Sequence, residues 1–533
     1  MIFSKSVIFL SITMITHTVF AYADVNINEN KQNSVDETLQ TNEPVLQVKD
    51  VVFSGNTIFT NQQLKGLLDK DLGQAMTLAQ IKQLAKKIQN SYHKEGYSLT
   101  RVVIPEQNFK DNQPVQILVL EGKLGKIEYS GNNHYNTKFI TQSLSASDIV
   151  SGRAFTLGQL ENTLARINRQ SGVKVVSVLK PGTEQGTTDI SIHVNENPRV
   201  IAALELNNYG SKSTGEYRAQ PYIDVFNLTG RGDNLSLMGM HSIDGEGSYF
   251  ARLAYNTPIN SLGTKAAVYA YKGNVRVGEQ LAVLDIKGDN SGYGLGLQHD
   301  FVKDPFNFFQ IESWFESYDL KQTILDEEYA NDKIRKIRLV GNYEHLNENS
   351  RSIYTLSLHQ GLGEILGAMP NNSIMSTRSV AGGDNNFTKI NFDWTRIQKI
   401  TPRFSLLPRL TAQYAFDSVV SGEQISIGGY NSVVGQSPSE YSGDSGFNLN
   451  LEGRYALLPQ NDKYQLSTRI DYGWVSVKDR LINQDKSNSL TGISLGFLLN
   501  PTKNISLRLD YGRPLGDRTD RDDYAYLQAR YTY

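Results

Sequence analysis

Residues 466–475 read Leu-Ser-Thr-Arg-Ile-Asp-Tyr-Gly-Trp-Val, and within them large or apolar side chains mostly alternate with polar or small ones. Because successive side chains of a β-strand point to opposite faces, this alternation predicts a strand with one apolar and one polar face. The pattern recurs at 447–455 and at 504–512. Such strands suit a half-buried soluble sheet, and they equally suit a membrane barrel with lipid outside and a wet lumen.

The links between the alternating segments distinguish these two possibilities. About sixteen segments of about ten residues follow Pro198. Links after even-numbered segments are mostly short, as at 346–350, whereas several links after odd-numbered segments are long, as at 318–333, 361–387 and 419–446. Short turns at one rim and long loops at the other are typical of an outer-membrane barrel. We therefore predict a transmembrane β-barrel of about 16 antiparallel strands over residues 199–533.

Aromatic residues and the last segment fit this prediction. Several aromatic residues of the segments, Tyr269 and Trp474 among them, are expected to form girdles at the two membrane interfaces, against outer-membrane lipid. The last segment ends on Tyr533. That aromatic ending resembles the signal that the barrel assembly machinery reads, so this machinery is an expected partner of the C-terminal strand.

Composition excludes several classes of function. Lys+Arg number 53 and Asp+Glu 55, so no basic field indicates nucleic acid. The absence of cysteine rules out a thiolate zinc site, a disulfide scaffold and a cysteine nucleophile. The eight histidines show no metal-ligand spacing, and neither a G-x-S-x-G nor a Walker pattern occurs. We therefore expect no enzyme, no cofactor and no metal site.

The N-terminus carries a predicted export signal. Lys5 precedes an apolar run from Val7 to Ile15, and Ala21-Tyr22-Ala23 supplies a small-residue cleavage site. Cleavage is expected between Ala23 and Asp24, which makes residues 1–23 a signal peptide. Residues 24–45 are polar and aperiodic.

Residues 46–198 contain an internal repeat with a spacing of about 76 residues. Val-Phe-Ser-Gly-Asn at 52–56 recurs at 128–132 as Glu-Tyr-Ser-Gly-Asn, and the strand pattern at 115–121 recurs at 190–196. Each copy also contains a helix pattern, which opens with Thr-Leu-Ala-Gln-Ile in the first copy and with Thr-Leu-Gly-Gln-Leu in the second. Matched spacing in several separate elements indicates duplication. We expect two units of order β-α-α-β-β, at 46–122 and 123–198.

A small sheet that is covered by helices on one face leaves an edge strand open. An open edge can take up an extended guest chain. The pattern therefore allows two interpretations of the repeated units, a polypeptide-docking module or a plain spacer.

An export signal, two such units and a sixteen-strand barrel together resemble the transporter component of two-partner secretion. This is the family of haemolysin activators and filamentous-haemagglutinin exporters, whose periplasmic repeats are called POTRA domains. Asn207-Asn208-Tyr209-Gly210-Ser211 looks like the family's opening hairpin, and the stretch that begins at Glu423-Gln424 looks like its extracellular loop that folds back into the pore. The matching loop residues are Gly428, Gly429, Ser432, Val433, Val434, Gly435, Gly443 and Asp444.

The tip of that loop departs from the family pattern. The family's tip reads Val-Arg-Gly-aromatic, whereas residues 433–436 read Val-Val-Gly-Gln, so Val434 stands in place of the arginine. In the family, the arginine pairs with the aspartate of a lumen strand that reads aromatic-x-Asp-x-Gly. Here Arg469, Asp471 and Gly473 match that strand, with Arg469 in the aromatic position. Because residues two apart share a face of a strand, we expect Arg469 to pair with Asp471 and Val434→Arg to be tolerated.

The resemblance implies an exporter in the outer membrane of a Gram-negative cell. Its POTRA domains would recognise an unfolded β-helical exoprotein in the periplasm, and its barrel would secrete it without ATP, with activation of the cargo as a further role. One alternative is an outer-membrane protein insertase of the same architecture, which usually carries more than two repeats. The other is a solute porin, which needs no periplasmic repeats.

Overall fold

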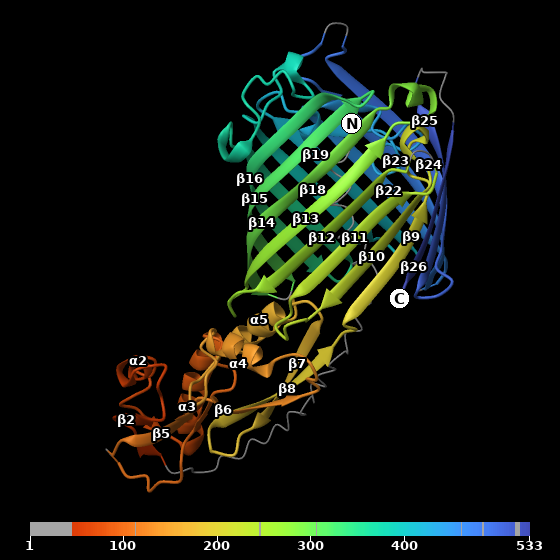
Figure 1. Ribbon diagram of the computed structural model, residues 1–533. Coiled ribbons are helices and arrows are strands. Elements are labelled where there is room, and N and C mark those ends of the chain that lie inside the picture. Colours follow the sequence, from red (N-terminus) through yellow and green to blue (C-terminus); the bar gives the residue numbers. More distant parts are fainter. Residues whose placement is uncertain are drawn as a thin grey trace.

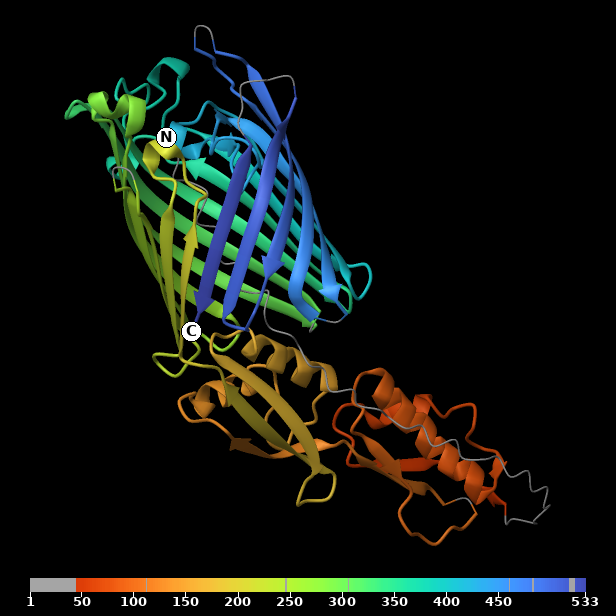
Figure 2. The ribbon, with the colours of Figure 1, turned by 90° about the vertical axis from the view of Figure 1, so that its right-hand side faces the viewer.

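The computed structural model describes residues 45–533 except 112, 245–246, 305, 460, 482–483 and 517–522. The predicted signal peptide, its cleavage site and nearly all of the polar segment at 24–45 lie outside the described residues. Two small α+β units precede a closed barrel, and the second unit lies against one end of the barrel while the first lies farther away (Figures 1 and 2). None of the helices in the described part of the chain is long and apolar enough to cross a bilayer.

The two units have the same topology. In each, the last strand (β5 or β8) is the centre of a three-stranded sheet, where it pairs in parallel with one edge strand (β2 or β6) and antiparallel with the other (β4 or β7). The first unit contains β1 (Leu46–Gln47), β2 (Val51–Ser54), α2 (Asn61–Gly66), β3 (Ala75–Met76), α3 (Leu78–Lys94), β4 (Arg101–Val103) and β5 (Val115–Leu120). The second contains β6 (Lys123–Ser130), α4 (Thr137–Ser145), α5 (Leu157–Ile167), β7 (Val173–Pro181) and β8 (Thr187–Glu196).

The repeated sequence elements have matching roles in the two units. Thr77 and Thr156 both form capping boxes with the glutamine three residues later, which explains why α3 and α5 begin where they do. Glu121 accepts hydrogen bonds from the backbone amides of Thr57 and Ile58. Glu196 plays the same part in the second unit, where it accepts from the backbone amides of Asn133, His134 and Tyr135. These equivalent contacts support duplication of one ancestral unit.

A closed barrel of 16 antiparallel strands follows, as the sequence predicts. Each strand pairs with its sequence neighbours, apart from the excursion between β19 and β22, and β26 pairs with β9 to close the cylinder. The strands are β9 (Val200–Asn207), β10 (Arg218–Phe226), β11 (Asn234–Ser242), β12 (Tyr249–Pro258), β13 (Thr264–Arg276), β14 (Lys287–Asp304), β15 (Asn307–Ile324), β16 (Glu327–Asn347), β17 (Ser350–Gly361), β18 (Thr388–Lys399), β19 (Phe404–Ala415), β22 (Ser445–Leu458), β23 (Asn461–Ser476), β24 (Ser487–Leu499), β25 (Ile505–Leu515) and β26 (Tyr524–Thr532). The loops contain the short helices η1 (Lys212–Thr214), η2 (Glu279–Leu284), η3 (Ile365–Gly367), η4 (Ser379–Ala381) and η5 (Ser421–Glu423), and the strands β20 (Ile425–Ile427) and β21 (Tyr441–Gly443).

Side-chain alternation divides the barrel wall into an outer and an inner face. On β23, Ile470 and Leu466 are about half exposed on the outer face, whereas Arg469 and Asp471 are buried on the inner face. This distribution is inverted relative to a soluble protein, and it is the pattern expected where lipid covers the outside.

Two expectations from the sequence are wrong in detail. The link expected at 318–333 is mostly strand, because β15 and β16 continue to a two-residue turn at Leu325-Asp326, where both residues have positive φ. One face of the hairpin is covered, because Ala330, Asp332 and Ile334 of β16 are at most 1% exposed and Asp332 accepts from Thr377 of the link between β17 and β18. Tyr269 does not belong to a girdle but points into the lumen, where its hydroxyl donates to Glu316 Oε1 at 2.8 Å.

The second unit is fixed to the periplasmic rim of the barrel. Arg169, just beyond α5, forms an ion pair with Glu344 of β16 at 2.6 Å and stacks over the ring of Phe308, 4.1 Å away. The backbone amide of Asn136 donates to Gly230 O in the turn between β10 and β11 at 2.8 Å. The second unit is therefore held against the rim of the barrel.

Candidate functional site: the loop inside the barrel

The connection from β19 to β22 folds back into the barrel. It contains η5 and the two-stranded hairpin of β20 and β21, which packs against the inner face of β22 and β23. Ile425, Ile427, Val433 and Val434 of this loop have no exposed surface. β20 is followed by Gly428 and Gly429, which both have positive φ, a conformation that favours glycine. We call residues 421–444 the lumen loop.

Glycines on three neighbouring strands allow the tip of the lumen loop to lie directly on the wall. A Cβ at Gly473 would lie 2.9 Å from side-chain carbons of Ile427 and Val433, and a Cβ at Gly492 would lie 2.0 Å from Val434 O. Gly512 is similarly close, with Gly435 N at 3.0 Å from the position of a Cβ. Any side chain at these positions would push the tip away from the wall. The three glycines therefore form a groove in the inner wall, and the tip of the lumen loop fills it.

Arg469 and Asp471 hold the tip from the wall. The Nε of Arg469 lies 2.7 Å from Asp471 Oδ1, and the guanidinium also donates to the carbonyl oxygens of Tyr430 and Ser432 at 2.8 and 3.1 Å. Asp471 accepts from the backbone amide of Val434 through its other oxygen at 3.0 Å. Because both residues are at most 6% exposed, these are charge-assisted bonds with little competing water. The pair therefore binds the loop's backbone with both of its charges.

Further polar contacts surround this pair. Ser432 donates through its hydroxyl to Asn448 Oδ1, and Asn450 donates to Ser432 O at 2.5 Å. Gln436, which replaces the aromatic residue of the family tip, donates to Thr491 O at 3.0 Å. The tip is therefore held by hydrogen bonds from both the loop and the wall, and Val434 contributes its backbone amide and a buried aliphatic side chain.

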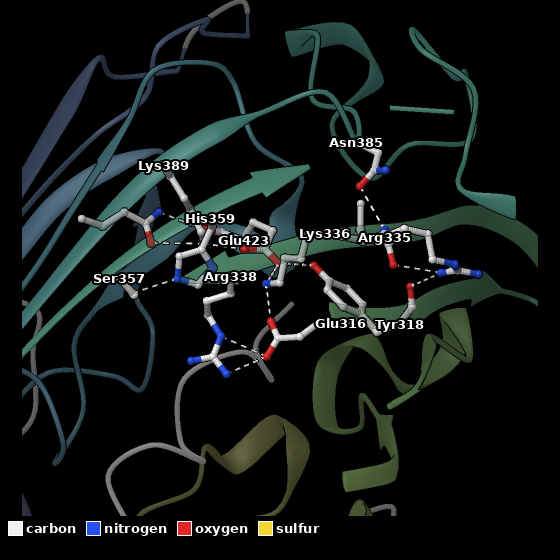
Figure 3. A network of polar contacts seen from close by, with 12 residues as sticks. Glu316, Tyr318, Arg335, Lys336, Arg338, Ser357, His359, Asn385, Lys389 and Glu423 are labelled. Atoms are coloured by element: carbon white, nitrogen blue, oxygen red, sulfur yellow. Dashed lines mark hydrogen bonds and ion pairs between the residues drawn. The ribbon is translucent and has the colours of Figure 1, made fainter. Parts of the chain in front are cut away.

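A second anchor lies where the loop enters the lumen (Figure 3). Glu423 is 2% exposed and forms ion pairs with Lys336 of β16 and Lys389 of β18, both at 2.5 Å. The hydroxyl of Tyr318 donates to the same carboxylate at 2.6 Å. Arg338 and Glu316 extend the network along the wall through an ion pair at 2.8 Å. Two buried lysines are thus neutralised by a carboxylate that belongs to the loop.

A third anchor lies at the exit from the lumen loop. Asp444 is 1% exposed and forms an ion pair with Arg378 of the extracellular link between β17 and β18. It also accepts from the backbone amides of Val419 and Lys478, at 3.2 and 2.8 Å. Gly443 approaches the backbone of Ser476 so closely that a Cβ would lie 2.6 Å from its carbonyl oxygen. Asp444 therefore fixes three extracellular segments at the base of the loop.

Sequence reasoning located some of these residues and missed others. The structure places the predicted loop residues, together with Arg469, Asp471 and Gly473, in one contiguous region, although Gly443 and Asp444 lie at the base and not at the tip. Lys336, Lys389, Arg378 and Tyr430 were missed. The alternation on β16 contains a usable signal for Lys336, because the next residue, Ile337, faces outward.

The charged residues of the lumen loop and of the wall form ion pairs with one another. Within the ranges that the structure describes, no group of three or more His, Asp or Glu side chains is placed to hold a metal ion. Together, these ion pairs and hydrogen bonds hold the lumen loop inside the barrel.

Comparisons with known proteins identify the family of the chain. Residues 186–499 match the family model for the haemolysin secretion/activation proteins ShlB/FhaC/HecB, and residues 46–122 match that for the ShlB-type POTRA domain. The heme/hemopexin transporter protein HuxB of Haemophilus influenzae (strain 86-028NP) is 22% identical over 488 residues, which cover 90% of this chain and 85% of HuxB. The hemolysin transporter protein ShlB of Serratia marcescens is 24% identical over 92% of this chain and 86% of its own.

Solved structures share the fold. CdiB from Escherichia coli superposes with a TM-score of 0.73 at 19% identity, covering 94% of this chain and 93% of its own. BamA from Haemophilus ducreyi lacking POTRA domains 1–3 gives a TM-score of 0.53 at 14% identity, over 92% of this chain and 100% of its own. Because the ShlB/FhaC/HecB model matches more than half of the residues, the chain belongs to this family of outer-membrane transporters, which secrete partner proteins.

Proposed function

We propose that this transporter captures an unfolded exoprotein in the periplasm through its two POTRA-like units and passes it through the barrel after the lumen loop withdraws. The cargo is a large secreted protein that folds as a β-helix. The names of the relatives point to the same class of task, since HuxB is described as a heme/hemopexin transporter and ShlB as a hemolysin transporter.

The open edge of the second unit is the observation that supports capture. β7 is nine residues long and lies at the edge of its sheet, so one side of its backbone is available to a guest strand except at Val175, whose amide and carbonyl groups are bound by the side chain of Asn168. Val176 and Val178 of β7 are 45% and 57% exposed. Exposed edges with apolar side chains are usually avoided in soluble proteins because they recruit other chains. By contrast, the edge strands β2 and β4 of the first unit are only four and three residues long.

The inner wall of the barrel supports passage. Glu452, Arg454 and Arg508 form a chain of ion pairs on the inner face of β22 and β25, at 2.8 and 3.0 Å. A wall of mutually paired charges offers an extended polypeptide few apolar surfaces to adhere to. No sequence pattern for nucleotide binding occurs, so we propose that folding of the cargo outside the cell prevents it from sliding back and so drives its movement.

Charge substitutions on β7 test the site of capture. The double variant Val176→Asp/Val178→Asp places two carboxylates on the proposed docking strand, and we expect secreted cargo to fall at least tenfold, on the order expected if about 1.4 kcal/mol of docking free energy is lost. Val52→Asp on β2, where the valine is 46% exposed, is the matched control and is expected to secrete normally. Heat-modifiable gel mobility verifies barrel assembly. A normal yield from the β7 variant, or a loss confined to Val52→Asp, would refute capture at β7.

A further inference from the structure

The seam between the first and last strands is the shortest junction of the barrel. Five residues of β26, Gln528 to Thr532, pair with five of β9, Ala203 to Asn207. The two adjacent junctions, β9 with β10 and β25 with β26, each pair eight residues. Since each paired residue contributes to the ladder of backbone hydrogen bonds, the seam holds the cylinder closed with fewer bonds than its neighbours do.

The ladder stops well below the extracellular end of β26. Asn208 prolongs it by one step, because its backbone amide donates to Leu527 O at 3.3 Å and its side chain accepts from Leu527 N at 2.7 Å and donates to Ala525 O at 2.8 Å. Beyond Asn208 the chain of β9 turns away, and Tyr209 enters the lumen side of the seam. Tyr526 of β26 is 3% exposed on the same side. The rings of these two residues are 6.1 Å apart between centroids, so aromatic side chains continue the junction here.

Tyr430 of the lumen loop fills this position. Its ring stacks on Tyr209 with centroids 3.9 Å apart and planes inclined by 12°, and it meets the ring of Tyr526 at 5.0 Å. Its hydroxyl donates to Asp510 of β25 at 3.0 Å. The adjoining tip adds another contact, because the backbone amide of Gly435 donates to the hydroxyl of Tyr526 at 3.0 Å. One residue of the loop therefore contacts the first strand's end, the last strand and the strand before it.

We propose that Tyr430 is a positioning residue that closes the barrel seam. While the lumen loop occupies the pore, the Tyr430 ring continues the junction of β9 with β26 above the point where the ladder ends. When the loop withdraws, the ring leaves with it and the seam loosens. Opening the pore and loosening the wall are thus coupled, and the coupling must act in both directions. The inference uses the loop withdrawal of the proposed function, but its tests need no cargo, so failure of the export scheme and failure of the seam coupling give different results.

Cysteine labelling tests whether removal of the Tyr430 ring loosens the seam. The chain contains no cysteine that would interfere. Ala203→Cys introduces a thiol at a seam position that is 6% exposed. In purified full-length protein we expect Tyr430→Ala to raise the rate of maleimide labelling about tenfold, equivalent to about 1.4 kcal/mol, because two aromatic contacts are lost. Tyr430→Phe keeps the ring and should label within about twofold of the parent rate. Tyr472→Ala removes a tyrosine that is 39% exposed on the outer face and should leave labelling unchanged.

A reversible disulfide across the seam tests whether a closed seam keeps the pore closed. This test does not depend on the stability of the Tyr430 variants. Ala203 and Thr532 face each other across the seam, so cysteines at both positions are close enough for a disulfide. In planar lipid bilayers we expect oxidation to reduce the frequency of pore openings about tenfold and dithiothreitol to restore it. Equal labelling rates in Tyr430→Ala and the parent, or an opening frequency that is insensitive to the disulfide, would overturn the coupling.

Discussion

The pair of Arg469 and Asp471 provides the sharpest test of how the lumen loop is held. Asp471 is 1% exposed and Arg469 6%, and together they bind the loop through the amide of Val434 and the carbonyls of Tyr430 and Ser432. Removal of one member of a buried pair leaves the other charge without its partner, which costs about 3–5 kcal/mol. If about 3 kcal/mol of this stabilises the loop-in state, Arg469→Ala or Asp471→Ala raises the loop-out population on the order of 100-fold.

The double variant distinguishes a pair from two independent contacts. When both residues are alanine, no buried charge is left unpaired, so the cost should fall short of the sum of the single variants by about 3 kcal/mol. We expect each single variant to impair secretion and the double variant to be scarcely worse. The assay is secreted cargo per assembled transporter, with heat-modifiable mobility as the folding control and entry of a large antibiotic as the measure of loop withdrawal. Fully additive losses would refute the pairing.

Val434→Arg extends this test. The sequence alone suggested that the family residue is tolerated here, but the structure shows that Val434 is fully buried against the glycine groove and that Arg469 already occupies Asp471. A second guanidinium would therefore be buried beside the first. We expect Val434→Arg to impair secretion in the parent and to rescue it partly in Arg469→Ala, where Asp471 has lost its cation. If Val434→Arg changed secretion equally in the parent and in Arg469→Ala, an arginine at position 434 would not be able to replace Arg469 as the partner of Asp471.

Other predictions concern the remaining anchors and the periplasmic units. Glu423→Gln removes the carboxylate that pairs with both buried lysines, which leaves Lys336 only the more distant Glu316 at 3.5 Å, and should increase pore openings in planar bilayers at least tenfold, whereas Glu364→Gln, an exposed loop substitution, should not. Deletion of residues 46–122 should leave a heat-modifiable barrel but abolish secretion, since no barrel strand lies there; undiminished secretion would exclude a role in capture. An epitope inserted within 361–387 should bind antibody on intact cells, and one within 346–350 should not; the reverse result would invert the topology. Burial acts to raise the pKa of Glu196, but hydrogen bonds from His134, Tyr135 and Asn133 outweigh burial and lower that pKa. The stabilisation that these hydrogen bonds give the folded protein is therefore present above pH 4.5, the ordinary pKa of glutamate, and is lost as the pH falls below it. Thermal unfolding of the full-length protein between pH 3 and 7 should show this loss, which Glu196→Gln should abolish.

The sequence by itself determined the elements whose signals are local. Period-two alternation marks strands such as β23 because one face meets lipid and the other meets the lumen. The repeat at about 76 residues predicted both units, down to the equivalent carboxylates Glu121 and Glu196. The pairing of Arg469 with Asp471 follows from their two-residue spacing on a strand, since both side chains then share a face.

Only the tertiary structure decided which distant residues meet inside the barrel. Alternation assigns a side chain to the lumen, but closure and register decide what lies opposite it, and these depend on the whole set of strands. Glu423 therefore meets Lys336, 87 positions earlier in the chain, and Asp444 meets Arg378, 66 positions away. Tyr430 reaches the seam for the same reason, because the two ends of a closed barrel become neighbours only when the last strand pairs with the first.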